Sequence, residues 1–372
     1  MSDNSSSISN SISSWLYDAF QRLYSEAPYR LSKTGRAFPA WHFFLELTRR
    51  CNLRCRMCQY ITYLENTSGA EQRRGELTTE EWKDVIDQTG RLSFITFTGG
   101  EPLIREDFLE LLTYAAQRAR VHYITNATLL KAPTAEVSVN LAPRRIGGKG
   151  LNFVGVSLEG PAELHDHIRQ QPGAFDKSAA GIKLLSDFRG TLKKQCPMVH
   201  ITTVIQDANV HALEHMPQIA ASLGADTLNL TTETRVFDLP ELGKRPPGAW
   251  RTEEIPRPRI APETLSDALE KTEKAAQQIG IALRMPRIPR QELLRYYSGE
   301  VDLSRYTCRS PWNTLTVGRT GDAYPCWLLT IGNVRERSLA ELWNNEKMRK
   351  FRQACRKGLF APCPGCCFIE YR

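Results

Sequence analysis

Short apolar segments alternate along most of the chain with longer segments whose apolar residues recur at helical spacing. Buried strands are predicted at 41–47, 93–98, 121–125, 151–158, 199–205 and 226–230. Amphipathic helices are predicted at 77–90, with a cap at Thr78 or Thr79, and at 105–119, 174–188, 210–223 and 263–279. This alternation is typical of parallel βα units. The spacing favours an α/β fold built as a partial or full βα barrel, in which chemistry occurs at the C-terminal ends of the strands.

The segments outside this pattern divide the chain. A Ser-rich start is predicted to be disordered, and Trp15–Tyr24 is predicted to form a short packed helix. The expected units are 1–38 for this start, 39–239 for the barrel, 240–299 for a Pro/Arg-rich loop and linking helix, and 300–372 for a cysteine-rich module.

Composition excludes several classes of protein. The chain is 41% hydrophobic and 24% charged, which is ordinary for a globular protein. It has no apolar run long enough to span a membrane and no secretory signal pattern, so a cytoplasmic location is expected. The net charge is +8, but the basic residues do not form one tract, so nucleic acid is an unlikely partner and a modest preference for an anionic substrate is expected.

The cysteines are the strongest chemical signal. Nine of the ten lie in two groups, 51–58 and 308–367, and in a reducing cytosol such groups are more often metal ligands than disulfides. The first group, CNLRCRMC, places Cys51, Cys55 and Cys58 together with no fourth ligand close by. A structural zinc site needs four ligands, whereas a cubic [4Fe–4S] cluster on three cysteines leaves one iron open to an exogenous ligand.

Four further segments strengthen this interpretation: TFTGGEP at 96–102, TNATLL at 125–130, GVSLEG at 155–160 and HDHIR at 165–169. With the triplet, they make residues 40–235 resemble the radical S-adenosylmethionine (SAM) enzymes. Met57 stands where that family commonly has an aromatic residue. The resemblance implies a partial (β/α)6-type barrel and a cluster whose open iron is chelated by SAM. One electron from the cluster then cleaves SAM to a 5′-deoxyadenosyl radical.

The resemblance also implies roles for individual residues. The cofactor-binding candidates are Gly99, Gly100, Glu101 and Pro102 near the methionine amino group, Ser157 and Glu159 near its carboxylate or the ribose, Arg169 near the carboxylate, and Asn126. Asn126 is the weakest candidate because Ala127 replaces the usual glycine after it. Taken singly, the glycines could form only a tight turn, and the polar residues could be ordinary strand ends.

The second cysteine group resembles the SPASM/twitch modules of radical SAM enzymes. Cys308, Gly321 and Cys326 have the spacing Cys-x12-Gly-x4-Cys, with a predicted hairpin between the cysteines, and Cys363-Pro-Gly-Cys366 follows. The longer form of the module has an internal run of cysteines that this chain lacks. One auxiliary [4Fe–4S] cluster is therefore expected on Cys308, Cys326, Cys363 and Cys366, although Cys355 or Cys367 could replace a ligand and a four-thiolate zinc site remains an alternative.

Two clusters imply an oxidising radical enzyme in a biosynthetic pathway, with the auxiliary cluster accepting an electron. The expected substrate is a small polar metabolite or a ribosomal peptide, and the expected electron donor is a reductase such as flavodoxin or ferredoxin. A peptide maturase or an epimerase is the alternative, and Cys196 or Cys355 is then a candidate hydrogen-atom donor. The non-enzyme alternative is an iron–sulfur or zinc protein that binds nucleic acid.

Overall fold

The computed structural model describes residues 23–236 and 245–372. The Ser-rich start and most of the helix predicted at Trp15–Tyr24 lie outside these ranges, and residues 23–31 are helical. Within the described ranges, none of the helices combines the length and the apolar character needed to cross a lipid bilayer.

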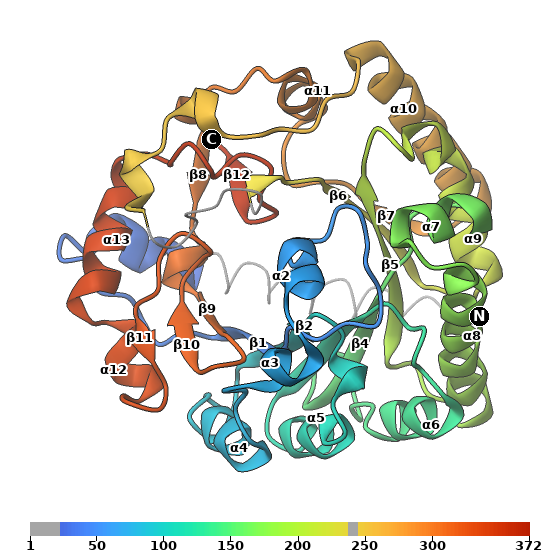
Figure 1. Ribbon diagram of the computed structural model, residues 1–372, viewed down its shortest axis with the longest axis horizontal. Helices are drawn as coiled ribbons and strands as arrows, with labels where there is room; N and C mark the ends of the chain where they lie inside the picture. The colour runs from blue at the N-terminus through green and yellow to red at the C-terminus, as the bar shows by residue number, and fades with distance from the viewer. Residues whose placement is uncertain (1–22, 237–244) are drawn as a thin grey trace, which may run out of the picture.

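Six parallel strands form the barrel, each hydrogen-bonded to the next (Figure 1). They are β1 (His42–Thr48), β2 (Phe94–Gly99), β3 (Arg120–Thr125), β4 (Gly150–Ser157), β5 (Met198–Ile205) and β6 (Thr227–Thr232). All six strands predicted from the apolar pattern are present, with ends shifted by at most two residues. The predicted partial α/β barrel is confirmed.

Helices cover the outside of these strands and follow them in the chain (Figure 1). They are α4 (Thr79–Asp87), α5 (Phe108–Ala116), α6 (Ala132–Asn140), α7 (Ala162–Arg169), α8 (Ala174–Thr191), α9 (Met216–Ser222) and α10 (Pro262–Ile279). Thr78 caps α4 through a reciprocal pair with Glu81, as predicted. The helix predicted at 210–223 is divided into a 3-10 turn, Val210–His215, and α9, because Pro217 suits a helix start.

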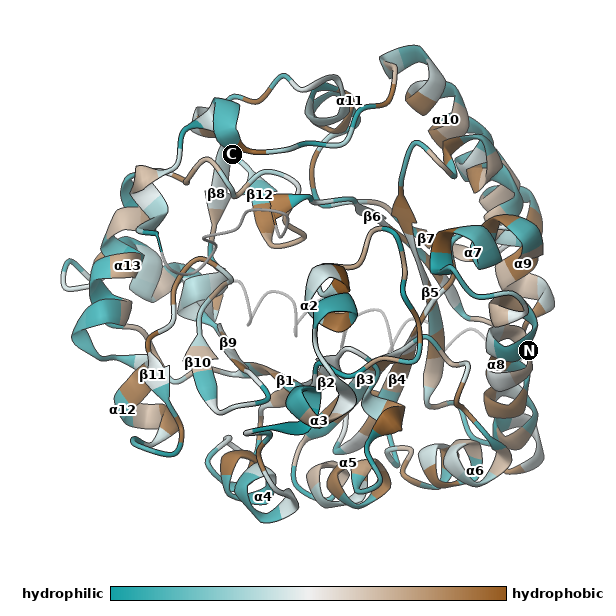
Figure 2. Ribbon diagram, in the orientation of Figure 1, coloured by the Kyte–Doolittle hydropathy of each residue, from teal (hydrophilic) through white to brown (hydrophobic). Residues whose placement is uncertain are grey.

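Successive side chains of each strand point to opposite faces of the sheet, so they pack into two separate layers. Phe43, Leu45 and Leu47 of β1 belong to the layer between sheet and helices, where brown and teal residues alternate around α5 and α8 (Figure 2). On the other face, the His42 ring contacts the Phe94 ring, and His122, Phe153 and His200 continue this ring contact across β3, β4 and β5. Burial lowers the pKa of His42 to about 3, of His200 to about 4 and of His122 well below its usual value, so these three imidazoles are neutral at pH 7.

The C-terminal module extends the barrel sheet instead of standing apart from it. The strand order is β11-β10-β9-β1-β2-β3-β4-β5-β6-β7, and β9 (Thr314–Val317) pairs with β1 in parallel. The predicted hairpin is β9 with β10 (Asp322–Tyr324), which are antiparallel. The other elements are β7 (Ala282–Arg284), α11 (Arg290–Ser298), β8 (Tyr306–Cys308), β11 (Gly332–Asn333), α12 (Leu339–Trp343), α13 (Glu346–Lys357) and β12 (Ile369–Tyr371).

Candidate cofactor and active site

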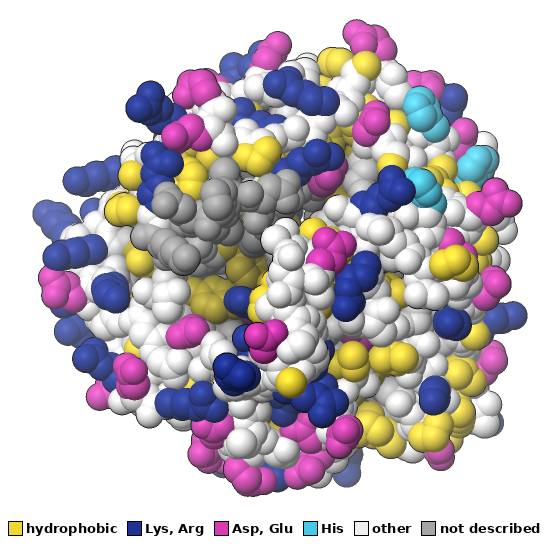
Figure 3. Space-filling view, viewed as in Figure 1, with side chains coloured by type: hydrophobic (Ala, Val, Ile, Leu, Met, Phe, Trp, Pro, Cys, Tyr) yellow, Lys and Arg dark blue, Asp and Glu magenta, His cyan; other side chains and the backbone are white. Residues whose placement is uncertain are grey.

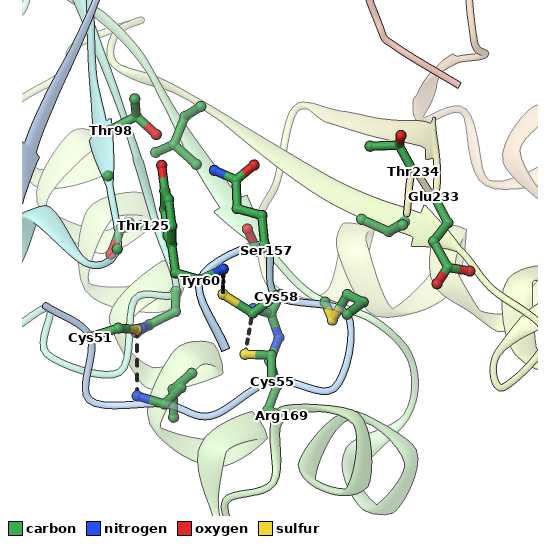
Figure 4. A pocket seen from close by; sticks show the side chains of 18 of the residues that line it. Cys51, Cys55, Cys58, Tyr60, Thr98, Thr125, Ser157, Arg169, Glu233 and Thr234 are labelled. Carbon is green, nitrogen blue, oxygen red and sulfur yellow. Dashed lines mark hydrogen bonds between the residues drawn. The ribbon is translucent and has the colours of Figure 1, made fainter. Parts of the chain in front are cut away.

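A cavity of about 280 Å³ lies at the C-terminal ends of the barrel strands. The cysteine loop after β1 forms one side of it, and the ends of β2 to β6 form the others (Figure 4). The lining residues are Cys51, Leu53, Cys55, Met57, Cys58, Gln59, Tyr60, Thr98, Gly99, Gly100, Ile124, Thr125, Asn126, Ser157, Arg169, Val204, Thr232, Glu233 and Thr234. The cavity therefore contains the whole cysteine triplet and five of the eight predicted cofactor-binding residues.

The triplet loop runs from the end of β1 to the short helix α2 (Ile61–Asn66), and α3 (Gly69–Arg73) follows. Backbone N–H groups point at the sulfurs, because Leu53 N lies 3.4 Å from Cys51 Sγ and Tyr60 N lies 3.4 Å from Cys58 Sγ. Burial raises the pKa of Cys51 to about 12, so without metal this thiol is protonated at neutral pH. Such N–H groups stabilise thiolates that bind a metal.

Arg169, at the end of α7, joins the triplet to the far side of the cavity. Its Nη1 lies 3.4 Å from Cys55 Sγ, and its Nη2 donates to Glu159 Oε1 at 2.7 Å. Glu159 also accepts from Val204 N at 2.9 Å, so its carboxylate holds Arg169 from behind and does not line the cavity. The Arg169 Nε is buried without a protein partner. A cationic group with an unused donor suits an anionic ligand at this place.

Gly99 and Gly100 approach protein backbone closely. A Cβ on Gly99 would lie 2.1 Å from Thr48 O, and a Cβ on Gly100 would lie 2.3 Å from Arg50 O. Gly100 N donates to Thr48 O at 2.7 Å, and Glu101 N donates to Arg50 O at 2.8 Å. The sequence suggested that these glycines make room for a ligand. They line the cavity, but they are also required to bind the segment that carries Cys51.

Glu101 is fully buried and faces the next strand, not the cavity. Its carboxylate accepts from Thr125 Oγ1 at 2.7 Å and from Asn126 N at 2.8 Å. This contact fixes Asn126, whose Nδ2 lies 3.9 Å from Cys51 Sγ. Pro102 opens a 3-10 turn, Pro102–Ile104, behind the wall.

Ala127, which replaces the glycine of the usual TNG sequence, has an unusual backbone conformation. Ala127 occupies a left-handed backbone conformation with φ of 58°, where glycine is normally favoured. Its methyl group is nonetheless fully buried.

Several thiols of the C-terminal module lie near one another. Cys308 ends β8, Cys326 follows β10, Cys355 lies on α13, and Cys363 and Cys366 flank a turn. Burial raises the pKa of Cys308, Cys326 and Cys363 to about 12 each, and neighbouring thiols of the group add to the effect. The Cys355 thiol interacts electrostatically with these three, and Cys366 with Cys367 and Cys308. Cys355 therefore lies near three of the four predicted ligands, while the described residues include no set arranged around a single metal ion.

The auxiliary cysteine loop touches the wall of the cavity. Thr232, which lines the cavity at the end of β6, donates its hydroxyl to Gly365 O, between Cys363 and Cys366, at 2.6 Å. Tyr296 of α11 donates to Glu233 O at 2.8 Å on the same side. The two cysteine groups therefore flank one cavity.

The two candidate hydrogen-atom donors do not line this cavity. Cys196 is buried before the start of β5, whereas Val204, which lines the cavity, lies about 20 Å along the strand from its first residue, Met198. Cys355 packs against Trp312 and Phe351 inside the C-terminal module.

Sequence reasoning missed several lining residues, among them Gln59, Thr98, Glu233 and Thr234. Glu233 is the most notable, because its carboxylate is buried and pairs with Arg235 at 3.1 Å. The signal that could have found it is the run TTET directly after an apolar strand.

Comparison with known proteins agrees with this architecture. The Radical SAM superfamily matches residues 45–216, and SPASM, an iron–sulfur cluster-binding domain, matches residues 308–367. The AdoMet-dependent heme synthase of Methanosarcina barkeri is 29% identical over 82% of this chain and 83% of its own length. The mycofactocin maturase of Mycolicibacterium smegmatis is 35% identical over 50% of this chain and 43% of its own.

Solved structures share the fold. Streptococcus suis SuiB bound to its precursor peptide SuiA aligns with a TM-score of 0.63 and 15% identity, over 91% of this chain and 72% of SuiB. The structure of anSMEcpe with bound AdoMet and a peptide aligns with a TM-score of 0.56 and 16% identity, over 86% of this chain and 89% of that one.

The two domain matches, together with this fold, therefore indicate an iron–sulfur enzyme that uses SAM. The chain belongs to the radical SAM superfamily and carries a C-terminal SPASM domain. A [4Fe–4S] cluster, SAM and auxiliary iron–sulfur chemistry follow from these two domains. The residues present fit the first of these groups, because three thiols share one cavity with the guanidinium of Arg169 and its unused Nε.

Proposed function

We propose that the protein oxidises its substrate in a biosynthetic pathway by removing a hydrogen atom from a C–H bond and passing one electron to an auxiliary cluster. The observation that carries this proposal is the 2.6 Å hydrogen bond from Thr232, on the cavity wall, to Gly365 in the auxiliary cysteine loop. An electron acceptor against the wall of the substrate cavity suits a net oxidation better than a redox-neutral step.

The proposed roles of the protein residues follow from their positions. Cys51, Cys55 and Cys58 hold the first cluster, and Arg169 offsets part of its negative charge. Asn126 and Ser157 offer polar groups to SAM from the ends of β3 and β4. Together the bound cofactors supply the one-electron chemistry that removes the hydrogen atom.

Other residues do not line the cavity but hold the lining residues in place. Glu101 and Glu159 are the supports of Asn126 and Arg169, through hydrogen bonds of 2.8 Å and 2.7 Å. Cys308, Cys326, Cys363 and Cys366 are the proposed auxiliary ligands, with Cys355 as the alternative that its position near the first three supports.

Two substrate classes remain in the proposal. The relatives that match most of this chain are named heme synthases, which supports a small-molecule substrate. The net charge of +8 favours an anionic one, and Figure 3 shows Lys and Arg side chains spread among Asp and Glu side chains over one face of the molecule. A ribosomal peptide is the second class, supported by the mycofactocin maturase and the peptide-bound SuiB.

The test uses anaerobically reconstituted protein and measures iron per chain and 5′-deoxyadenosine formed from SAM with dithionite. Wild type is compared with a Cys51→Ala/Cys55→Ala/Cys58→Ala variant and a Cys363→Ala/Cys366→Ala variant. We expect about eight irons in wild type and about four in each variant, from two four-iron clusters, with deoxyadenosine lost only in the first variant. If wild type itself formed deoxyadenosine while holding only about four irons per chain, the auxiliary acceptor would be absent and the proposed oxidation would be contradicted.

A further inference from the structure

A buried carboxylate stands between the two cysteine groups without belonging to either. Glu46 lies on β1 opposite Thr98 of β2, which lines the cavity, and its side chain is 1% exposed. A charged group in such a place is costly unless hydrogen bonds compensate it. Both carboxylate oxygens have such a partner, and the two partners come from opposite parts of the chain.

The first partner belongs to the cysteine triplet loop. Tyr60 follows Cys58 by two residues and donates its hydroxyl to Glu46 Oε1 at 2.6 Å. Tyr60 also lines the cavity, and Figure 4 shows its ring extending away from the cysteine thiols. Glu46 is therefore separated from the cavity by one phenol group.

The second partner belongs to the auxiliary module. Tyr324 of β10 precedes Cys326 by two residues and donates its hydroxyl to Glu46 Oε2. It reaches Glu46 because β9 pairs with β1 and β10 pairs with β9. The carboxylate thus lies one hydrogen bond from a residue beside each cysteine group.

The charges around Glu46 permit both protonation states. Burial raises its pKa, while the hydroxyls of Tyr324 and Tyr60 and the charge of Arg49 oppose that effect. Arg49 stands 5.3 Å from the Tyr60 ring, and its positive charge favours the ionised form of Glu46. A phenol can donate or accept a hydrogen bond, so either tyrosine can adapt when Glu46 gains a proton.

We propose that Glu46 takes up a proton when an electron enters the adjacent auxiliary site, and that Tyr60 links it to the cavity where the substrate releases that proton. This inference rests on the proposed function. After loss of the hydrogen atom, the substrate would release one electron to the auxiliary cluster and one proton, and Glu46 takes up one proton at the carboxylate that its Tyr60 hydrogen bond joins to the cavity wall. The added negative charge of the reduced cluster is then offset by the neutral carboxyl.

The test needs no substrate, because the coupling affects the reduction potential of the auxiliary cluster. Redox titrations of reconstituted protein, followed by electron paramagnetic resonance, are made at several values between about pH 5 and pH 9, above the usual pKa of a glutamate. One proton taken up per electron lowers the auxiliary potential by about 59 mV for each tenfold fall in proton concentration. We expect this slope over part of the range in wild type and a flat profile in Glu46→Gln.

Glu292→Gln is the matched control. Glu292 is also a buried carboxylate that accepts from a tyrosine, Tyr306 at 2.7 Å, and Tyr306 also precedes an auxiliary cysteine by two residues. Unlike Glu46, Glu292 pairs with Arg305 at 2.7 Å and its pKa is lowered, so it stays ionised and Glu292→Gln should keep the wild-type slope. A flat wild-type profile, an unchanged slope in Glu46→Gln, or a slope lost equally in both variants would overturn the inference.

A second measurement covers the case in which Glu46→Gln fails to fold. Reduced-minus-oxidised infrared spectra of wild type should show a new C=O band from a protonated carboxyl group, and absence of this band would also overturn the inference. The proposed function fails separately, since a protein that loads no auxiliary cluster gives no auxiliary signal to titrate. If the auxiliary cluster is present but its reduction potential has the same pH dependence in wild type and Glu46→Gln, only this inference is rejected and the proposed function is not affected.

Discussion

Replacing Gly100 by alanine tests whether the cysteine loop is held by close backbone contact. The added Cβ would lie 2.3 Å from Arg50 O and 2.7 Å from Arg49 O, well inside the normal contact distance, and both atoms belong to backbone that cannot rotate away. Overpacking of this kind costs about 1–3 kcal/mol. The two hydrogen bonds from Gly100 N and Glu101 N add about 0.5–1.5 kcal/mol each if they break. We therefore expect a loss of about 2–6 kcal/mol.

Denaturant unfolding of the metal-free protein measures this loss, and iron content after reconstitution measures displacement of Cys51. Gly190→Ala is the control, because a Cβ at this exposed position of α8 meets nothing within 4 Å. It should leave iron binding unchanged and stabilise the helix by about 0.5–1 kcal/mol. If Gly100→Ala kept the wild-type midpoint and iron content, the close contact could not be what positions the cysteine loop.

Three further changes test other contacts. Arg169→Met leaves the Glu159 carboxylate buried without its cation and should cost about 3–5 kcal/mol in urea unfolding, whereas a cost below about 1 kcal/mol would show that the pair is not needed. Glu81→Gln removes a carboxylate whose pKa the Arg335 hydrogen bonds lower to about 2. Because the pair is partly exposed, wild type should be more stable to unfolding than this variant by at most about 1 kcal/mol at neutral pH. The difference in stability should shrink as pH falls from about 4.5 to about 2, and a difference that stays constant with pH would refute the prediction. Thr232→Val leaves a carbonyl of the auxiliary loop unpaired and should cost about 1–3 kcal/mol and reduce auxiliary iron but not triplet iron.

The parts of the structure that sequence could predict are those set by local pattern. Strand β5 was expected at 199–205 and spans Met198–Ile205, since its apolar and β-branched residues suit a strand buried on both faces. The triplet was placed correctly after β1 because a loop that follows a parallel strand must open at the C-terminal end of the barrel. These features depend on neighbours in the chain.

The parts that sequence could not predict depend on contacts between distant residues. Nothing near Glu46 in the chain indicates that Tyr324 would reach it, because that contact requires β9 to pair with β1. The hydrogen bond between Glu101 and Thr125 could not be predicted either, since the ends of β2 and β3 meet only in the folded sheet. The choice among auxiliary ligands stayed open because Cys355 approaches the other thiols from a separate helix.

The pairing of β1 with β9 also affects how the chain is made. Phe44 leaves the ribosome long before its partner Thr316, by a delay on the order of 15–50 seconds at ordinary translation speed. During that time the β1 edge presents unpaired backbone groups beside three uncovered cysteines, and such an edge invites pairing with other chains. Production of intact protein should therefore depend on what shields this edge during synthesis.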